Sequence, residues 1–299
     1  MIPLSEVKKY YLKPGILEEI HRVGEEREVV PVYKAKFYGK RPSYMPYITD
    51  YKLAVSDGAT SFHMSVERWK NVLDLEKAKD SKLALDELRT GWDLIFDIDA
   101  KEGKEGIKYA IITAEEIIKF LQEEGIKNIY VKFSGSRGFH IAVNGKGFPE
   151  KIMGKPTPQH YPDLLHKIVF YIKHKITPFA TQRIQEELET SKSLDELVEI
   201  EGNWSYRHLF RAPYSLNEKT WLISLPLFFY QLKKFTLDMA EIKNFKGVRI
   251  KFLEKWEVDE LELLSLEAID FAETHEYEKE REAFLAKTIL KKRKGEITS

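Results

Sequence analysis

The chain has 299 residues, of which 43% are hydrophobic and 12% aromatic, enough to fill one sizeable core or two modest domains. Its 48 basic residues balance its 48 acidic residues, so the net charge points to no nucleic-acid or membrane partner, and any basic surface must be local. It contains no cysteine, which excludes disulfides, thiolate zinc sites, iron–sulfur clusters and thiol nucleophiles.

No apolar run approaches the roughly 18 residues that a membrane span needs. The first residues also lack the charged head and the apolar core of a signal peptide. We therefore expect a cytoplasmic protein with no membrane partner.

In chain order, the first predicted elements are a broken helix and a hairpin. Residues 7–26 have helical spacing that is interrupted near Pro14 and Gly15. Residues 27–39, REVVPVYKAKFYG, alternate in polarity and predict a strand or hairpin, and residues 61–69 predict a short strand.

Stronger strand and helix signals follow. Residues 93–99, DLIFDID, alternate in polarity and predict a strand. Residues 113–126 predict a helix that Thr113 and Glu116 cap at its start and that Gly125 ends.

The rest of the chain mixes both element types. Residues 128–145 predict two strands joined by a glycine-containing turn, residues 151–197 are mostly helical, and the last stretch predicts charged helix with a basic tail. This order indicates an α+β or α/β protein. No repeat, low-complexity tract or linker marks a boundary, so a single compact unit is the default expectation.

Two aspartates stand on the strand predicted at 93–99. Side chains two apart on a strand point the same way, about 6.6 Å apart along the backbone, so Asp97 and Asp99 project from one face. Such carboxylates can face solvent or cap the next loop, or they can share metal ions. Their place at the carboxyl end of an apolar run, where sheets commonly carry ligand sites, favours a functional role.

A second unusual element is FSGSRGFHI at 133–141. Its two glycines allow a tight turn in which backbone N–H groups are free to bind a ligand. Ser134, Arg137 and His140 add a hydroxyl, a cation and an imidazole. These are the donors that a triphosphate requires. A plain hairpin turn explains the glycines through positive φ, but not the spacing of the three polar residues.

A third element spans residues 199–219, EIEGNWSYRHLFRAPYSLNEK. Its two glutamates, Glu199 and Glu201, alternate on a strand-like run, and aromatic residues separate the basic side chains that follow, which are Arg207, His208, Arg211 and Lys219. The stretch either completes the same site or is a charged edge strand with a proline-containing loop.

These three elements, in this order, resemble the catalytic subunit of archaeal and eukaryotic DNA primases and, more widely, the primase-polymerase superfamily that includes bacterial end-joining polymerases. DLIFDIDAK is similar to the first family motif, SGSRGFHI to its Ser-Gly-x-Arg-Gly-x-His motif, and RHLFRAPYSLNEK to its third. REVVPVY near Arg27 is similar to an N-terminal signature, so the resemblance runs thinly from about residue 20 to 225. The joint occurrence is specific, whereas each motif alone is not.

The resemblance implies a fold and a division of the chain. It implies an α+β primase-polymerase core, with a mixed sheet flanked by helices, over residues 1–225. Residues 226–299 would form a mainly helical extension packed on that core.

The resemblance also implies a site. Asp97, Asp99 and Glu199 would hold two divalent cations, Mg²⁺ or Mn²⁺, which would make a buried carboxylate pair tolerable. The incoming nucleoside triphosphate would be bound by Ser134, Arg137, His140, Arg211, Asn217 and Lys219.

Two positions depart from the family pattern. The family's third metal-binding aspartate lies twelve residues before Arg211, where this chain has Glu199. Glu201, on the same face of the predicted strand, is the competing candidate, and only one of the two is expected to lie level with the aspartate pair. The family's histidine before x-Lys is here Asn217, which can donate a hydrogen bond but carries no charge.

The zinc-binding insertion that many primases carry after the first motif is missing, and with no cysteine in the chain no zinc is expected. Three histidines do not replace it, and core or surface positions explain them better: His160, His166 and His174.

We therefore expect template-directed nucleotidyl transfer that makes primers on single-stranded DNA from nucleoside triphosphates. Trp204, Tyr206 and Tyr214 are candidates for stacking on bases, with core packing as the alternative. A large primase subunit or another replication or repair protein is the expected protein partner. Two other functions stay open, namely a repair or gap-filling polymerase that only extends primers, and a single-stranded-DNA-binding subunit whose active site has decayed.

Overall fold

The computed structural model describes residues 2–202, 204–275, 279 and 281 of the chain. Ten α-helices are named in this part, and their bounds are α1 Leu4–Tyr11, α2 Ile16–Gly24, α3 Ile48–Ser56, α4 Leu75–Ala78, α5 Lys82–Leu88, α6 Ile107–Glu123, α7 Asp163–Leu188, α8 Leu194–Leu197, α9 Phe229–Leu232 and α10 Glu262–Thr274.

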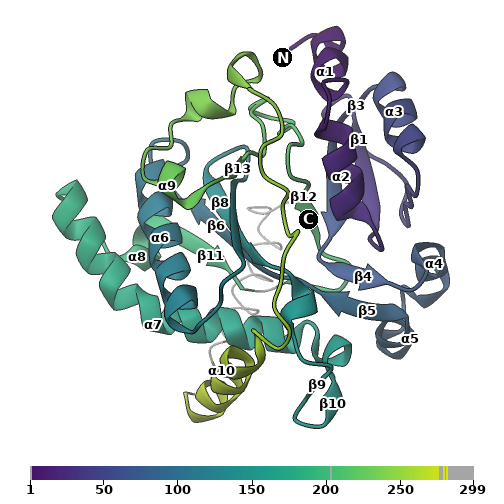
Figure 1. Ribbon diagram of the computed structural model, residues 1–299. Coiled ribbons are helices and arrows are strands. Elements are labelled where there is room, and N and C mark those ends of the chain that lie inside the picture. The colour runs from purple at the N-terminus through teal and green to yellow at the C-terminus, as the bar shows by residue number, and fades with distance from the viewer. Residues whose placement is uncertain (1, 203, 276–278, 280, 282–299) are drawn as a thin grey trace.

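Two sheets form the frame of the molecule (Figure 1). The central sheet has the order β11-β6-β8-β7-β13, with β11 Val198–Glu201, β6 Leu94–Ala100, β8 Gly138–Val143, β7 Ile129–Phe133 and β13 Pro226–Leu227. The second sheet has the order β12-β3-β1-β2, with β12 Leu209–Arg211, β3 Ala59–Ser65, β1 Val29–Tyr33 and β2 Phe37–Tyr38. Two small ribbons complete the strands, β4 Glu67–Trp69 with β5 Arg89–Trp92, and β9 Lys151–Ile152 with β10 Lys155–Pro156.

The α+β class is confirmed. The expected mixed sheet, with both parallel and antiparallel strand pairs, is not. Every pair of strands in the described part of the chain is antiparallel. The reason is connectivity, since β7 returns into β8 through a tight turn and β11 and β13 reach the sheet edges from distant segments.

The N-terminal elements agree with the sequence. Helix α1 ends at Tyr11 and α2 begins at Ile16, and between them Gly15 takes a left-handed φ of 87°. Strands β1 and β2 form the expected hairpin, and β3 pairs with the other side of β1.

Helix α6 begins earlier than the capping pattern predicts. Its N-cap is Gly106 rather than Thr113, and the hydroxyl of Thr113 donates to the carbonyl of Tyr109 within the helix. The first turns are stabilised by burial of Ala110 and Ile111 against the core. The predicted end is right, because Gly125 follows the helix with a φ of 84°.

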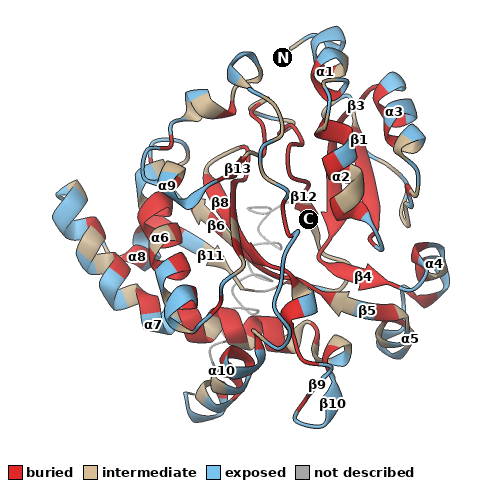
Figure 2. Cartoon of the chain, in the orientation of Figure 1, coloured by how far each residue is buried: buried red, intermediate tan, exposed pale blue. Residues whose placement is uncertain are grey.

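Helix α6 covers one face of the central sheet, where Phe96 and Ile98 of β6 are fully buried (Figures 1 and 2). Because side chains alternate along a strand, the residues between them, Asp97 and Asp99, lie on the opposite face. That face is turned away from α6.

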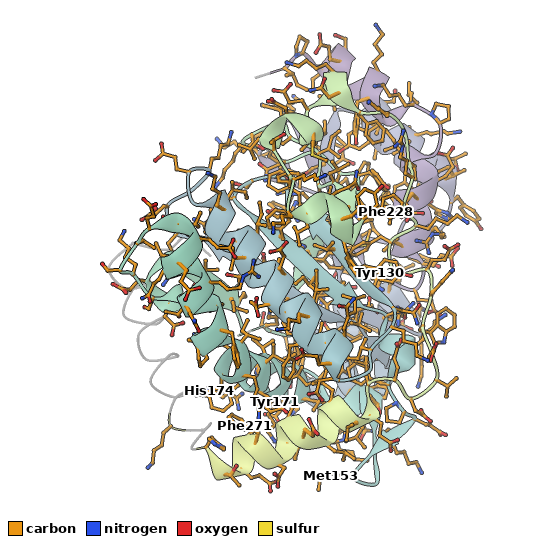
Figure 3. All side chains as sticks on the ribbon, turned by 60° about the vertical axis from the view of Figure 1, so that its left-hand side comes forward. Tyr130, Met153, Tyr171, His174, Phe228 and Phe271 are labelled. Carbon is orange, nitrogen blue, oxygen red and sulfur yellow. The ribbon has the colours of Figure 1, made fainter. Side chains whose placement is uncertain are left out.

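Helix α10 packs across α7 through aromatic contacts. The rings of Tyr171 and Phe271 lie 5.2 Å apart, and that of His174 lies 5.5 Å from Phe271 (Figure 3). Between β13 and α10 the chain is helical only in α9 and two short 3₁₀ turns, Leu237–Ala240 and Ile242–Asn244, and β13 itself pairs within the central sheet. The predicted basic tail, residues 291–299, lies outside the described residues.

Candidate active site

Two rows of polar residues cross the open face of the central sheet. In the first row, Lys132 of β7 pairs with His140 of β8, which pairs with Asp97 of β6. In the second row, Gly138 of β8 pairs with Asp99 of β6. Directly paired residues on neighbouring strands share a face, so the side chains of both rows project together.

The first row carries charges in a buried setting. The Nε2 atom of His140 lies 3.3 Å from Oδ1 of Asp97. That oxygen is buried, and no donor in the described part of the chain is aligned for a hydrogen bond to it. Burial would raise the pKa of Asp97, but His140 and Lys132 hold it below its ordinary value. Burial, followed by the charge of Lys132, lowers the pKa of His140.

The second aspartate has a cationic partner. Asp99 accepts hydrogen bonds from Arg137, whose Nε and Nη2 lie 2.8 and 2.7 Å from Oδ2. Burial, and then the negative charge of Asp97, raise the pKa of Asp99 to about 6. The two aspartates are therefore close enough to repel, which is the electrostatic signature of a cation site or a proton site.

The turn between β7 and β8 holds one unused hydroxyl. Ser134 is buried, and its hydroxyl has no hydrogen-bond partner among the residues that the structure describes, while its backbone N–H donates to the carbonyl of Gly138. A Cβ at Gly138 would lie 1.7 Å from the carbonyl oxygen of Ile98, so only glycine fits there. Gly135 has a φ of 95°, which explains the second glycine.

The second sheet contributes a wall of the site through β12 and β3. Arg211 of β12 pairs with His63 of β3, and both side chains reach Glu218. The distance from Arg211 Nη2 to Glu218 Oε2 is 2.7 Å, that from His63 Nε2 to Glu218 Oε1 is 2.8 Å, and the hydroxyl of Ser61 donates to Oε1. Burial would raise the pKa of Glu218, but the bonds from His63 and Arg211 hold it far below its ordinary range.

A short turn after β12 closes the site. The side-chain oxygen of Asn217 accepts from the backbone N–H groups of Lys219 and Thr220, at 2.9 and 3.1 Å, and thereby holds the turn. Thr220 donates its hydroxyl to the carbonyl of Gly135, which ties this turn to the one between β7 and β8. Asn217 thus shapes the site through its side-chain oxygen, and it lines the pocket described next.

These elements enclose one pocket of about 290 Å³. It is lined by Asp99, Ser136, Arg137, Arg211, Asn217, Glu218 and Lys219. Five of the nine residues predicted for the site therefore line this pocket. Asp97 and His140 stand on the first row of the sheet, and Ser134 lies in the turn between β7 and β8.

The ninth predicted residue, Glu199, lies on β11 directly opposite Asp99. The competing candidate, Glu201, lies opposite Asp97. The expectation that only one glutamate would be level with the pair is therefore wrong, because the register sets each one beside a different aspartate. Like charges directly opposite each other are unfavourable, and the charge of Glu199 is one cause of the raised pKa of Asp99.

This face suits a hard divalent cation in its donor set. Asp97, Asp99 and Glu199 offer carboxylate oxygens, the ligands that Mg²⁺ and Mn²⁺ prefer, and Oδ1 of Asp97 is buried without a donor. Among the described residues, no three acidic or histidine side chains are already gathered closely enough to hold an ion. The chemistry of these donors therefore fits a hard cation, but their positions do not yet form a metal site, because the carboxylates are not gathered and Asp99 is bonded to Arg137.

Some site residues carry no signal in the sequence. Lys132, Glu218 and His63 belong to the site only because strand pairing brings distant segments together. Burial lowers the pKa of Lys132 well below its ordinary value, and its Nζ donates to the hydroxyl of Ser224 at 2.7 Å.

Two of the three aromatic residues predicted to stack on bases lie in the core. Trp204 and Tyr214 are each 1% exposed. The indole N–H of Trp204 donates to the carbonyl of Glu201, and the hydroxyl of Tyr214 donates to that of Ile250. The ring of Tyr206 is half-buried over the Arg89 guanidinium. The core alternative therefore holds for Trp204 and Tyr214.

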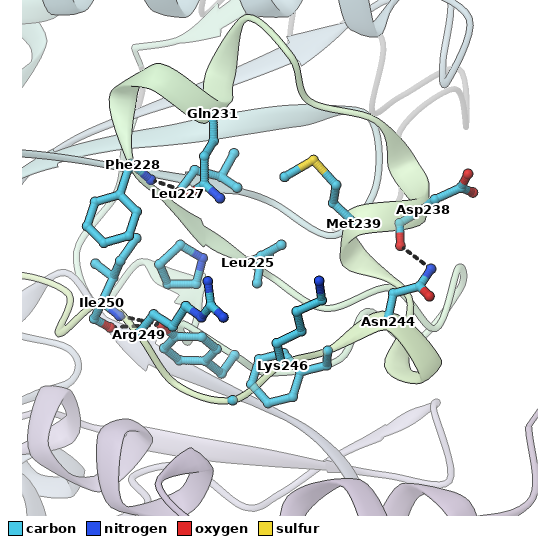
Figure 4. A pocket seen from close by; sticks show the side chains of 14 residues that line it. Leu225, Leu227, Phe228, Gln231, Asp238, Met239, Asn244, Lys246, Arg249 and Ile250 are labelled. Atoms are coloured by element: carbon cyan, nitrogen blue, oxygen red, sulfur yellow. Dashed lines mark hydrogen bonds between the residues drawn. The ribbon is translucent and has the colours of Figure 1, made fainter.

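A second pocket, of about 370 Å³, lies away from the predicted site (Figure 4). Leu225 and Met239 contribute to its apolar lining, and Lys246 and Arg249 also line it. None of the residues predicted for the site lines it.

The histidines that were expected to be core or surface residues have ordinary partners. Nε2 of His160 contacts the carbonyl of Ile152 at 3.0 Å, and Nε2 of His166 contacts that of Trp204 at 2.8 Å. In the part of the chain that the structure describes, no helix has the length and apolar character required to cross a membrane.

Comparison with known proteins finds similarity to DNA primase small subunits. No protein-family model matches the chain. It is 30% identical over 183 residues to the DNA primase small subunit PriS of Pyrobaculum calidifontis, a match that covers 51% of this chain and 58% of that protein. The match to PriS of Pyrobaculum aerophilum is 30% over 176 residues, covering 49% of this chain and 56% of that protein.

A shorter match, 39% identical over 64 residues, links the chain to an uncharacterized protein of Methanocaldococcus jannaschii and covers 21% of this chain and 14% of that protein. The chain thus spans less than two thirds of the length of the curated relatives it matches.

The fold has a counterpart among solved structures. The polymerase domain of Mycobacterium tuberculosis Ligase D, solved in complex with DNA, superimposes with a TM-score of 0.51 at 16% identity. The superposition covers 88% of this chain and 92% of that domain, so the likeness extends over both sheets rather than one motif.

Proposed function

Because the chain belongs to the archaeo-eukaryotic primase superfamily, we propose that it is a nucleotidyltransferase that synthesises primers on a single-stranded DNA template. The observation that carries this proposal is the juxtaposition of two carboxylates on β6 with a pocket that three cationic side chains line, Arg137, Arg211 and Lys219. Carboxylates with metal ions, next to cations that bind a triphosphate, are what phosphoryl and nucleotidyl transfer require.

The carboxylates would form the metal side of the site. Asp97, Asp99 and Glu199 would hold two divalent cations, Mg²⁺ or Mn²⁺. When bound, such a pair of ions activates the attacking 3′-hydroxyl and stabilises the leaving pyrophosphate.

The cations and free donors would form the nucleotide side. Arg137, Arg211 and Lys219 would neutralise the triphosphate from the pocket wall. Ser134, whose buried hydroxyl has no partner, and His140, whose Nδ1 has none, supply hydrogen-bonding groups that a ligand would satisfy. Asn217 would orient the turn that carries Lys219.

The protein would need a single-stranded DNA template and nucleoside triphosphates as partners. A large primase subunit, or another replication or repair protein, would be the macromolecular partner.

The test is synthesis on unprimed single-stranded DNA. The purified protein is incubated with this template, Mg²⁺ or Mn²⁺, and labelled ribo- or deoxynucleotides in separate reactions, and a primed template serves as the control. Products on unprimed DNA are expected. Products on primed DNA alone would replace the proposal with a polymerase that only extends primers. No product on either template would support a subunit whose site has decayed.

A further inference from the structure

The hairpin formed by β1 and β2 lies in a stretch of one-sided charge. Residues 29–49 contain four basic residues and no acidic one, although the chain as a whole has a net charge of zero. The basic residues are Lys34, Lys36, Lys40 and Arg41. A local surface of this kind attracts a polyanion where the whole molecule does not.

The hairpin exposes both its cations and its aromatic rings. Lys34, Lys36 and Lys40 are exposed, and none forms an ion pair with any residue that the structure describes. The fourth basic residue, Arg41, is different, because it is paired with the buried Glu28 at 2.7 Å. Three cations are thus free for a ligand.

Two large aromatic side chains share this hairpin, Phe37 and Tyr38, and each is 58% exposed. Adjacent residues on a strand point to opposite faces, so the two rings serve different sides. The Nζ of Lys36 lies 5.6 Å from the centre of the Phe37 ring. Tyr38 carries no such cation.

Tyr38 lies on the face of the second sheet that leads to the nucleotide pocket. It pairs with Val32, which pairs with Ser61 of β3. Its ring lies 5.4 Å from that of His63, and both Ser61 and His63 are bonded to Glu218, which lines the pocket. A chain of side-chain contacts therefore links the pocket wall to an exposed aromatic ring.

We propose that this hairpin binds single-stranded nucleic acid beside the nucleotide pocket, with Tyr38 stacking on a base and the three lysines contacting phosphates. An exposed ring among unpaired cations is the arrangement that binds single strands without sequence preference. A protein partner is disfavoured because the surface lacks the acidic groups that would pair with a mixed-charge partner. The inference rests on the proposed function, which requires a strand to pass close to the pocket.

The test is binding alone, without metal ions or nucleotides. Fluorescence anisotropy with labelled oligo-dT and oligo-rU, in separate arms, measures affinity as a function of salt. Tyr38→Ala is expected to weaken binding by at least about tenfold, whereas Tyr38→Phe keeps it, because stacking needs the ring and not the hydroxyl. Replacing Lys34, Lys36 and Lys40 together by alanine should reduce the slope of log K against log salt by about 2.

Matched controls come from the surface around the second pocket. Tyr230 is 72% exposed, and Lys233, Lys234 and Lys246 are exposed, so Tyr230→Ala and the triple alanine variant remove the same groups elsewhere. These variants should bind like the wild type. The inference is overturned if the wild type does not bind single strands, if the hairpin variants bind normally, or if the controls lose as much.

Binding and synthesis can fail separately, which keeps the two proposals apart. If Tyr38→Ala loses binding and the wild type does not synthesise, the proposal that the hairpin binds single strands is supported and the proposal that the protein is a polymerase is rejected. If the wild type synthesises and the hairpin variants bind as well as the wild type, the polymerase proposal is supported and the proposal that the hairpin binds single strands is rejected. All substituted side chains are exposed, so the variants should fold normally.

Discussion

Asp97 and Asp99 differ in their surroundings although they stand two residues apart on one strand. Asp97 has a buried oxygen with no donor, while Asp99 is bonded to Arg137. The alternation of DLIFDID was enough to predict that both carboxylates leave the strand on one side. Their different partners could not be predicted, because His140 and Arg137 reach them from another strand and another turn.

The first prediction concerns this pair. Replacing Asp97 and Asp99 together by alanine should reduce nucleotide incorporation to background, because the proposed cations lose two of their three ligands. The fold should remain, since removing carboxylates that repel each other costs the metal-free protein little. Incorporation assays and a thermal melt measure both effects, and near-normal synthesis by a folded variant would reject the two-metal hypothesis.

The second prediction concerns the third carboxylate. Glu199, opposite Asp99, keeps the family spacing to Arg211 without a gap, and we favour it over Glu201, opposite Asp97. Its side chain is one methylene longer than aspartate and must fold back, a loss of rotamer entropy that attraction to a divalent cation can offset. Glu199→Gln should remove most synthesis and weaken Mn²⁺ binding measured by titration calorimetry.

Glu201→Gln is the matched control, since it removes the same charge two residues away on the same strand face. It should leave synthesis and Mn²⁺ binding largely intact. The reverse pattern would move the third ligand to Glu201, and no effect from either variant would favour a decayed site.

At the scale of elements, strands were easier to place than helix starts. Alternation predicted β1 and β6, and apolar strand-like runs predicted β3, β7 and β8. Every residue of β3 and β8 is buried, so these two strands show no alternation in burial. The start of α6 was missed because Thr113 and Glu116 imitate a capping box, whereas burial of the preceding turn extends the helix to Ile107. Glu116 instead pairs with Arg183 of α7, at 2.6 Å.

The third prediction concerns the contact between α6 and α10. Burial, and then the hydrogen bond and charge of Glu267, raise the pKa of Glu124 to about 7, and Glu267 also accepts from Tyr171 at 2.9 Å. A carboxyl whose pKa is raised on folding binds its proton more tightly in the folded state. The protonated Glu124 carboxyl therefore contributes fully to the stability of this contact below its ordinary pKa. That contribution is lost as the pH rises toward about 7.

Hydrogen-exchange protection of the α10 amides, corrected for intrinsic rates, should fall between pH 5 and 8 in the wild type. Glu124→Gln should make it independent of pH, because an amide donates to Glu267 at any pH. Glu123→Gln, on an exposed neighbour, is the control and should keep the pH dependence, shifted slightly to lower pH because the charge of Glu123 also raises the pKa of Glu124. A pH-dependent Glu124→Gln variant would show that other groups govern the docking of α10.

At the scale of the whole molecule, the arrangement of the strands in two sheets could not be predicted from the sequence. The pairing of β12 with β3 joins Arg211 to His63, and no local pattern specifies a partner so distant in the chain. The pocket lies where the two sheets meet, so the wall that Arg211 and Glu218 form could not be predicted from the sequence. The division of the chain at residue 225 remains a prediction, and β13, just beyond it, is part of the central sheet.

A buried ionic cluster connects the two halves. Asp93, which precedes β6, is fully buried and accepts from Arg27, from Arg68 at 2.6 Å and from the backbone N–H of Gly145 at 2.8 Å. Arg27 also donates to the carbonyls of Ser65 and Val66, at the end of β3. Arg27, which stands in the N-terminal signature REVVPVY, thus connects the second sheet to the start of β6.

The last prediction follows from this cluster. Asp93→Ala should lower the free energy of unfolding by about 3–5 kcal/mol, because it leaves two guanidinium groups buried without their counter-charge. Urea denaturation measures the loss, and Glu257→Ala, which removes one partner of the exposed pair with Lys127, should leave the midpoint unchanged. If Asp93→Ala cost less than about 1 kcal/mol, apolar packing would be what joins the halves. A large loss with a single sharp transition would instead show that the cluster couples both sheets into one cooperative unit, as a site built from both sheets requires.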